Sequence, residues 1–265
     1  MSLDTVRLPF LEPLLPEGVE RGRIIGAFFA PASQWRLITS ATVASRLQAN
    51  LRSGVVTTTR FPKEIYSDLT KFGVDIEKTI ETGIFHVADW YTCITGRVPA
   101  KLPEDMPSSL KVSELGVISS KLWYTGKGAL PETDPNFIEF ALFDNLARLF
   151  SYNDSTSCIK FLNTTLARMK QDTRVGMCGF ATGVLEKTVY SDLESMCDGI
   201  IDVRTMEADG ITHTIVRARS FPNIMHTKGW HVMKAQPNSV SLVPASELGG
   251  QIYRTVSSLA NSQPQ

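Results

Sequence analysis

The segment with the clearest chemical meaning is the junction at residues 23–36, where an apolar run leads into a turn and a helical pattern. Nucleotide-binding proteins place the phosphate loop G-x-x-x-x-G-K-[ST] at such a junction. Its glycines expose backbone N–H groups to the phosphates, its lysine adds charge, and its hydroxyl holds Mg²⁺. The corresponding residues here are Phe29, Gln34, Trp35 and Arg36, with Ser33 in the turn before them. Side chains crowd the former glycine positions, and neither lysine nor hydroxyl is retained. We therefore expect no ordinary ATP hydrolysis and no bound cofactor or metal.

A second candidate is Asp144, which directly follows the apolar run 137–143. An acid in this place either binds a metal ion or accepts hydrogen bonds from nearby backbone N–H groups. We favour the structural role, because Arg36 stands where a hydroxyl would share the metal. The Arg36 guanidinium, one turn into the helix, is also expected to pair with Asp144 and close the site.

Other aromatic and histidine side chains have two interpretations each. Trp35 either fills the empty nucleotide pocket or stays exposed to stack on a base or a partner protein, and we favour the first. His226 and His231 are five residues apart across a glycine-containing turn, with no carboxylate or thiol near them in sequence. We expect hairpin contacts there rather than a metal site. Motifs of other hydrolases and of dehydrogenases, such as G-x-S-x-G, H-E-x-x-H and G-x-G-x-x-G, do not occur.

Composition narrows the class of protein. The 265 residues include 27 basic and 27 acidic ones, so a general attraction to nucleic acid or to an anionic membrane is not expected. Four widely spaced cysteines without a C-x-x-C pair argue against a zinc site or a disulfide framework. No apolar run reaches the roughly 18 residues of a membrane span, and the first residues lack the order of a signal peptide. The sequence predicts a cytoplasmic protein.

Hydrophobic periodicity predicts the elements that position these residues. Short apolar runs rich in β-branched residues predict strands, and apolar spacings of three and four predict helices. The predicted strands are 24–29, 55–59, 84–88, 137–143, 176–181, 199–205, 212–219, 230–234 and 239–243. The predicted helices are 37–51, 63–72, 112–124, 157–171 and 189–197. Strands that alternate with helices predict an α/β fold with a mostly parallel sheet, helices on both faces and an antiparallel carboxy-terminal edge.

One large domain accommodates these elements. Residues 1–22 contain three prolines and several turn residues and are expected to be an extended leader. The domain proper is expected to span 23–245, with a proline-containing surface insertion near 96–110. Residues 246–265 are polar and are expected to form a disordered tail.

Four segments occur in an order typical of one known family. They are the Leu-Leu-Pro-Glu-Gly-Val-Glu-Arg-Gly stretch at 14–22, the Phe-Gly-Val-Asp stretch at 72–75, the Phe-Ala-Leu-Phe-Asp strand ending at Asp144, and the run from Asp198 through Arg217 and Arg219 to His231. Together they resemble the RecA-like ATPases of the KaiC family over nearly the whole chain. The resemblance implies a RecA-like three-layer sandwich and makes Asp144 the acid of a Walker B strand.

The same resemblance shows what this chain lacks. The family carries two glutamates just after its second strand, the first of which prepares the attacking water. Their positions here hold Thr59 and Arg60, and neither side chain is a general base near neutral pH. In the family, basic residues at the positions of Arg217 and Arg219 reach toward the nucleotide of a neighbouring subunit. The alternative is a solvated pair of charges on an edge strand.

These features predict a non-hydrolysing RecA/KaiC-like protein that acts as a regulatory or scaffolding subunit. Its expected partners are further copies of itself or an active ATPase of the same kind. Two alternatives stay open. The first is a nucleotide-binding protein or weak ATPase that uses a divergent loop, with Arg36 on the phosphates and Trp35 under the base. The second is a nucleic-acid-binding recombination paralogue, for which the neutral charge gives no support.

Overall fold

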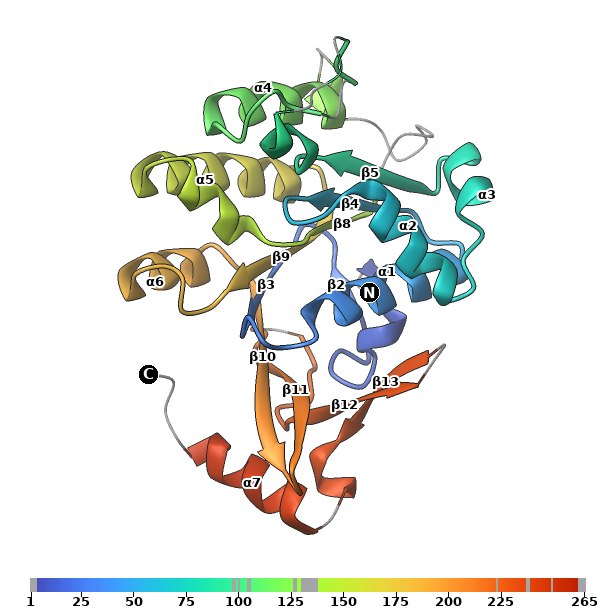
Figure 1. Cartoon of the computed structure of the whole chain (residues 1–265), viewed down its shortest axis with the longest axis vertical. Coiled ribbons are helices and arrows are strands. Elements are labelled where there is room, and N and C mark those ends of the chain that lie inside the picture. The colour runs from blue at the N-terminus through green and yellow to red at the C-terminus, as the bar shows by residue number, and fades with distance from the viewer. Residues whose placement is uncertain are drawn as a thin grey trace.

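A nine-stranded mixed sheet forms the centre of the molecule (Figure 1). The computed structural model describes residues 4–96, 99, 101–103, 106–125, 128–129, 138–222, 224–236, 239–248 and 250–261. In spatial order the strands are β13 (Ser239–Pro244), β12 (His231–Gln236), β11 (Ile211–Ser220), β10 (Gly199–Ala208), β3 (Ile24–Phe29), β9 (Val175–Ala181), β8 (Phe140–Phe143), β4 (Ser53–Thr57) and β5 (Phe85–Asp89). The strands from β10 to β5 are parallel, and β11, β12 and β13 continue the sheet antiparallel. The predicted mostly parallel sheet and its antiparallel carboxy-terminal edge are therefore both confirmed.

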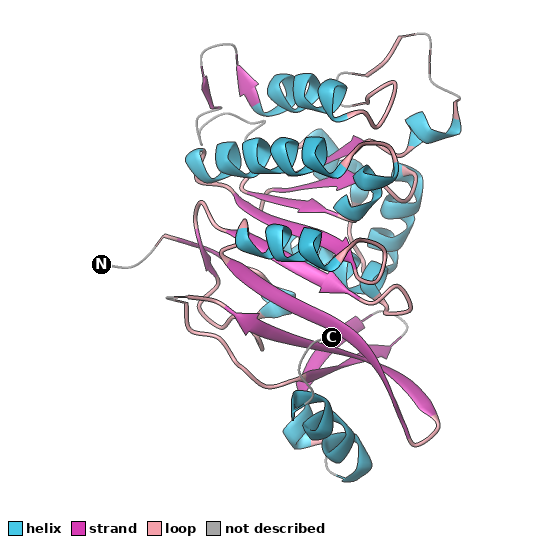
Figure 2. Ribbon diagram, turned by 90° about the vertical axis from the view of Figure 1, so that its left-hand side faces the viewer, coloured by secondary structure: helices cyan, strands magenta, loops and turns pink. Residues whose placement is uncertain are grey.

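Helices cover both faces of the parallel part, giving three layers. On one face lie α1 (Trp35–Gln48), α2 (Pro62–Lys71) and α3 (Ile76–Glu81). On the other lie α4 (Val112–Trp123), α5 (Ser155–Gln171) and α6 (Lys187–Ser195), with α5 and α6 in front of the strands in Figure 2. All six residues of β3 are buried, and they alternate between the two cores, which is why this strand reads as a continuous apolar run.

The crossing of the chain at β3 decides where the candidate site lies. From β3 the chain passes through α1 to β4, which is separated from β3 by β9 and β8. Because the strands are parallel, the loops that follow β3, β4, β8 and β9 all leave at the same edge of the sheet. Ligands of open α/β sheets bind at this carboxyl edge, where connections on either side diverge.

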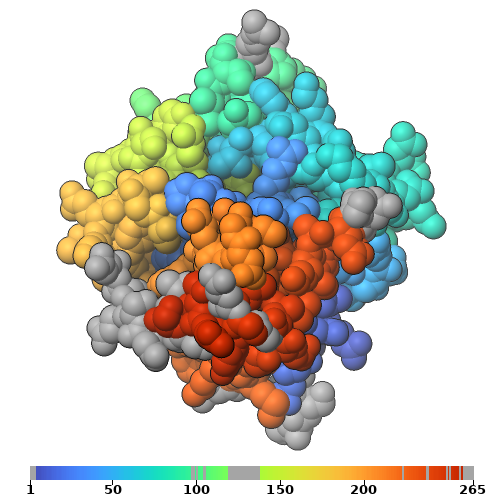
Figure 3. All heavy atoms as spheres, turned by 60° about the horizontal axis from the view of Figure 1, so that its bottom comes forward, coloured from blue at the N-terminus to red at the C-terminus, as the bar shows by residue number. Residues whose placement is uncertain are grey.

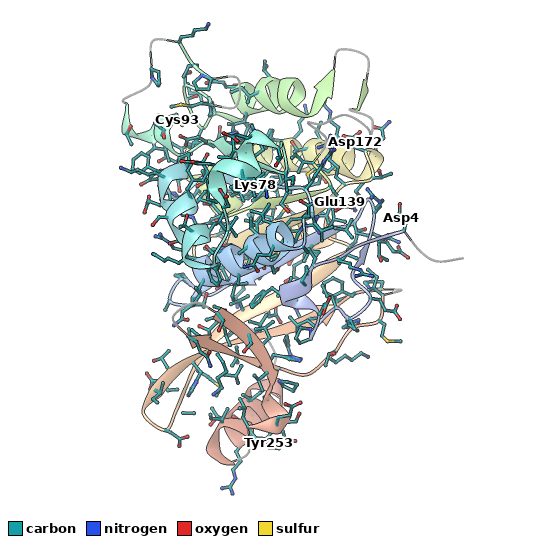
Figure 4. The ribbon with its side chains drawn as sticks, turned by 90° about the vertical axis from the view of Figure 1, so that its right-hand side faces the viewer. Asp4, Lys78, Cys93, Glu139, Asp172 and Tyr253 are labelled. Atoms are coloured by element: carbon teal, nitrogen blue, oxygen red, sulfur yellow. The ribbon has the colours of Figure 1, made fainter. Side chains whose placement is uncertain are left out.

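The amino-terminal segment is part of the main core rather than an extended leader. It contains β1 (Thr5–Val6), the short helix η1 (Pro9–Leu11) and β2 (Val19–Glu20). Leu8, Leu11, Leu14 and Leu15 are at most 1 % exposed and join the core beneath α1. Arg21 fixes the segment, since its guanidinium pairs with Asp4 at 2.8 Å and with Glu139 at 3.0 Å. Asp4 and Glu139 lie on the same side of the molecule in Figure 4.

The carboxy-terminal segment also differs from the expectation. Residues 250–261 form helix α7 (Gly250–Asn261) after the short helix η4 (Ala245–Glu247), where the sequence predicts a disordered tail. Val256 and Ile252 pack on the apolar face of β10, β11 and β12, around Met206, Ile215 and Val232. Figure 3 shows these carboxy-terminal elements, in orange and red, gathered on one face. The sequence analysis missed this amphipathic helix because its few apolar residues, although at helical spacing, lie within a polar sequence.

Four further elements complete the described chain. Short helices η2 (Thr92–Thr95) and η3 (Leu146–Ser151) follow β5 and β8, and β6 (Tyr124–Thr125) pairs with β7 (Gly128–Ala129) after α4. The described residues of the expected insertion at 96–110 carry no helix or strand, while residue 137, the first of the strand predicted at 137–143, lies outside the described residues. Within the described part of the chain, every helix is too short or too polar to cross a bilayer.

Candidate functional site

The loop between β3 and α1 uses its backbone donors within the protein. The N–H of Ala30 donates to the carbonyl of Val203 at 2.9 Å, and the N–H of Ser33 donates to the carbonyl of Ala30 at 2.8 Å. The N–H of Gln34 donates to the hydroxyl of Thr214 at 3.2 Å. A phosphate loop needs such groups to point at the ligand. Here β10 and β11 take two of them, and Pro31 has no N–H at all.

Trp35 begins α1 and lies inside the protein, at 6 % exposure. Its ring stacks on Phe29 with centroids 4.8 Å apart, and its Nε1 donates to the carbonyl oxygen of Asp144 at 2.6 Å. Gly179 on β9 leaves room for it, because a Cβ there would lie 2.9 Å from the indole and 2.4 Å from the Asp144 carbonyl oxygen. The alternative in which Trp35 is exposed to stack on a base or a partner is therefore wrong.

Asp144 is enclosed by three consecutive threonines at the end of β4. Its carboxylate accepts hydrogen bonds from the hydroxyls of Thr57, Thr58 and Thr59 at 2.9, 2.8 and 2.6 Å. The backbone N–H groups of Thr58 and Thr59 donate to it as well, at 2.8 and 3.3 Å. The side chain is 3 % exposed. The hydrogen bonds from nearby backbone N–H groups that the structural interpretation of Asp144 predicts are thus present, and Thr59 serves as one of its donors.

Arg36 does not pair with Asp144, which corrects the sequence prediction. Its guanidinium binds Asp68 of α2 in a bidentate pair at 2.6 and 3.0 Å and approaches Glu64 at 3.5 Å. The side chain projects toward α2 because α1 and α2 pack on the same face of the sheet. The threonine hydroxyls and backbone N–H groups take the hydrogen-bonding positions around Asp144, so the Arg36 guanidinium pairs with the carboxylate of Asp68 instead.

Arg60, at the second lost glutamate position, joins the same carboxylate. It is 7 % exposed and its guanidinium binds Asp68 at 2.7 Å. Burial lowers the pKa of Arg60 below its ordinary value, although the charges of Asp144 and Asp68 partly oppose that. Burial alone would raise the pKa of Asp68, but the hydrogen bond and charge of Arg36, together with the charge of Arg60, outweigh it and lower that pKa. The carboxylate therefore stays ionised between two arginines.

These contacts leave little space at the carboxyl edge. A cavity of about 150 Å³ remains, with Trp35, Thr59, Arg60, Glu64 and Asp144 among its lining residues. Ligand pockets usually measure about 300–1,000 Å³, so this one falls short even of a small cofactor. Within the described residues, no group of three or more histidine, cysteine or acidic side chains is placed to hold a metal ion.

Arg217 and Arg219 are engaged within the chain. Arg217 binds Asp202 at 2.8 Å and its guanidinium lies 4.5 Å from the ring centroid of Trp230. Arg219 binds Asp202 at 3.1 Å and Glu194 at 2.5 Å. Their strand, β11, lies between β10 and β12, but β12 pairs with it only at Ile215 and Val216, so the register pairs Arg217 with β10 alone. Both arginines do point to one face, as their alternation predicts.

The histidines and cysteines have ordinary surroundings. Nδ1 of His226 lies 2.9 Å from the carbonyl of Ile224, and Nδ1 of His231 lies 3.1 Å from that of Gly229, so the predicted hairpin contacts are present. The four cysteines are free thiols. Burial raises the pKa of Cys93 to about 11, so its thiol stays protonated at neutral pH.

Sequence reasoning missed the acid that organises the site. Asp68 lies four residues after Glu64, so both carboxylates fall on one face of α2, the face turned to α1. Two acidic residues four positions apart, beginning four positions after Arg60, were the signal in the sequence that could have predicted this ion-pair cluster. No protein-family model matches this chain, and a search of curated proteins finds no relative.

Proposed function

We propose that the protein is a non-hydrolysing RecA/KaiC-like subunit that acts through assembly rather than through turnover of its own nucleotide. One observation supports the proposal most strongly: protein side chains fill the region where the resemblance expects phosphate, metal and catalytic base. Trp35 fills the space beside β3, the threonines bind Asp144, and Thr59 at the position of the base is one of these donors, with the buried Arg60 next to it.

The fold supports the family part of this proposal. The β3–α1 junction lies at the middle of a parallel sheet, with the acid-ended strand β8 two strands away, and the antiparallel strands follow at the carboxy-terminal side. A loop after a central strand and an acid at the end of a nearby parallel strand, within a three-layer α/β fold, support the proposed relationship to the KaiC family.

The geometry also restricts how assembly would work. Arg217 and Arg219 are held by Asp202 and Glu194. Reaching a neighbour's nucleotide would require breaking a partly buried ion-pair network, which costs free energy. We therefore favour a scaffolding role with copies of itself or an active relative, over the supply of an arginine to a neighbouring active site.

We call the region around Trp35, Thr59 and Asp144 the closed site. Calorimetric titration with MgATP and a phosphate-release assay test whether it excludes nucleotide. We expect no binding at about 1 mM ATP, a concentration that would detect binding worth roughly 4 kcal/mol, and no phosphate release. An active KaiC-type ATPase from the same cell is the positive control. Saturable ATP binding or steady phosphate release by the purified chain would contradict the proposal.

Assembly is tested separately by light scattering on a sizing column. The chain is examined alone and mixed with the active ATPase, whose hydrolysis rate is measured in the same mixtures. We expect a homo-oligomer, co-elution or a changed rate. A monomer that neither co-elutes nor alters the rate would refute the scaffolding role.

A further inference from the structure

A separate cavity lies next to the closed site, between α1, α2 and the end of β12. It has a volume of about 300 Å³, twice that of the cavity at Asp144, and Leu37, Ser40 and Phe72 are among its lining residues. This is the lower end of the size range of small-molecule pockets, enough for one substituted ring.

The hydroxyl of Ser40 is the most informative group in this cavity. Ser40 is 3 % exposed, yet its Oγ has no hydrogen-bond partner among the described residues. Neighbouring hydroxyls of α1 behave differently, since Thr39, Thr42 and Ser45 each donate to a carbonyl of their own helix. A buried hydroxyl without a partner is unfavourable, and a polar atom of a ligand in the cavity would satisfy it.

The rim of the cavity has an excess of positive charge. The charged residues that line it are Arg36, Lys71 and Asp68, and both cations bind Asp68. Two cations against one carboxylate leave a net charge of +1. The side chains of Arg36 and Lys71 are 53 % and 66 % exposed, so their remaining N–H donors can meet an incoming anion.

Two walls are apolar. Leu37 and Phe72 are partly buried and pack against the main core, which holds them in place. A flat apolar body inserted between them would be removed from water.

From this arrangement we propose that the cavity binds a small aromatic carboxylate. The ring lies against Leu37 and Phe72, the carboxylate meets Arg36 and Lys71, and a polar substituent reaches the hydroxyl of Ser40. This inference goes beyond the scaffolding function, because it requires neither a partner chain nor a phosphate group.

The test uses 4-hydroxybenzoate as the probe, titrated into the full chain by calorimetry and by NMR. Lys71→Gln should weaken binding roughly three- to fivefold, as expected for an exposed charge contact. Ser40→Ala should weaken it roughly fivefold or more through the lost hydrogen bond. Lys78→Gln, which changes an exposed lysine of α3 that does not line the cavity, is the matched control and should leave affinity unchanged. Thermal unfolding confirms that each variant is folded.

Phenol, which lacks the carboxylate, should bind more weakly than the probe. Absence of probe binding, equal binding of phenol, or insensitivity to both cavity variants would each overturn the inference. Adenosine monophosphate is included as a competitor. If it displaces the probe through contacts of its base alone, that result would also count against a carboxylate site. Failure of the scaffolding proposal would appear instead as MgATP binding or as a lack of assembly, so the two outcomes are distinguishable.

Discussion

Replacing Trp35 by alanine tests the closed site most directly. The indole is 6 % exposed, stacks on Phe29 and donates to the Asp144 carbonyl. A buried tryptophan removes about 150–250 Å² from water, worth roughly 4–6 kcal/mol at about 25 cal/mol per Å², and its hydrogen bond adds about 1 kcal/mol. Alanine keeps a small part of that burial and the pocket relaxes partially. We expect the free energy of unfolding to fall by about 4 kcal/mol.

Urea unfolding followed by circular dichroism measures this change. Trp35→Phe keeps a ring on Phe29 but loses the Nε1 donor, so it should cost about 1–2 kcal/mol. Tyr152→Ala truncates an aromatic side chain that is 42 % exposed and should cost less than about 1 kcal/mol. A loss below about 1 kcal/mol for Trp35→Ala would refute the reasoning, because a side chain that fills the site cannot be removed so cheaply.

Three further changes probe the same region. Asp144→Asn replaces a carboxylate surrounded by three threonine hydroxyls and two backbone N–H groups by an amide whose NH₂ faces donors, and should cost about 2–3 kcal/mol in urea unfolding; a neutral effect would mean the threonines do not hold it. The lowered pKa of Asp68 means that its ion pairs stabilise the fold fully above the unfolded carboxyl pKa of about 3.9 and are lost as pH falls through the lower folded-state pKa. Asp68→Asn should therefore destabilise the protein at neutral pH and by less in acid, and an equal loss at both pH values would argue against the pairing. Gly179→Ala places a Cβ 2.4 Å from the Asp144 carbonyl oxygen and should lower the melting temperature, whereas Gly116→Ala in α4, with nothing within 4 Å, should leave it unchanged or raise it; comparable melting temperatures for the two variants would contradict the close packing.

Local sequence patterns predicted most of the helices and strands. The apolar run of β3 and the three- and four-residue spacing of α1 predicted both elements to within a few residues. The prediction of a parallel sheet followed from their alternation, since a crossover helix between parallel strands has only one favoured hand. Short turns between the last strands likewise predicted the antiparallel side of the sheet.

Side-chain partners were harder to predict, because they depend on how helices pack. The sequence positions of Arg36 and Asp144 do not reveal that three threonine hydroxyls bind the Asp144 carboxylate. Asp68 comes 32 positions after Arg36 and reaches it only because α2 lies against α1. Helix α7 was missed for a related reason: its stability depends on the sheet face beneath Val256, which local propensity does not reveal.

The docked amino-terminal segment determines how much of the chain is needed for folding. A shortened chain that starts at residue 23 would lack four buried leucines and would uncover the apolar side of α1. It would also lose the contact between Arg21 and Glu139 at 3.0 Å. Newly exposed apolar surface of that kind promotes self-association and aggregation. Truncation here is therefore comparable to deleting a core element, and residues 4–22 belong to the folding unit as much as any strand of the sheet.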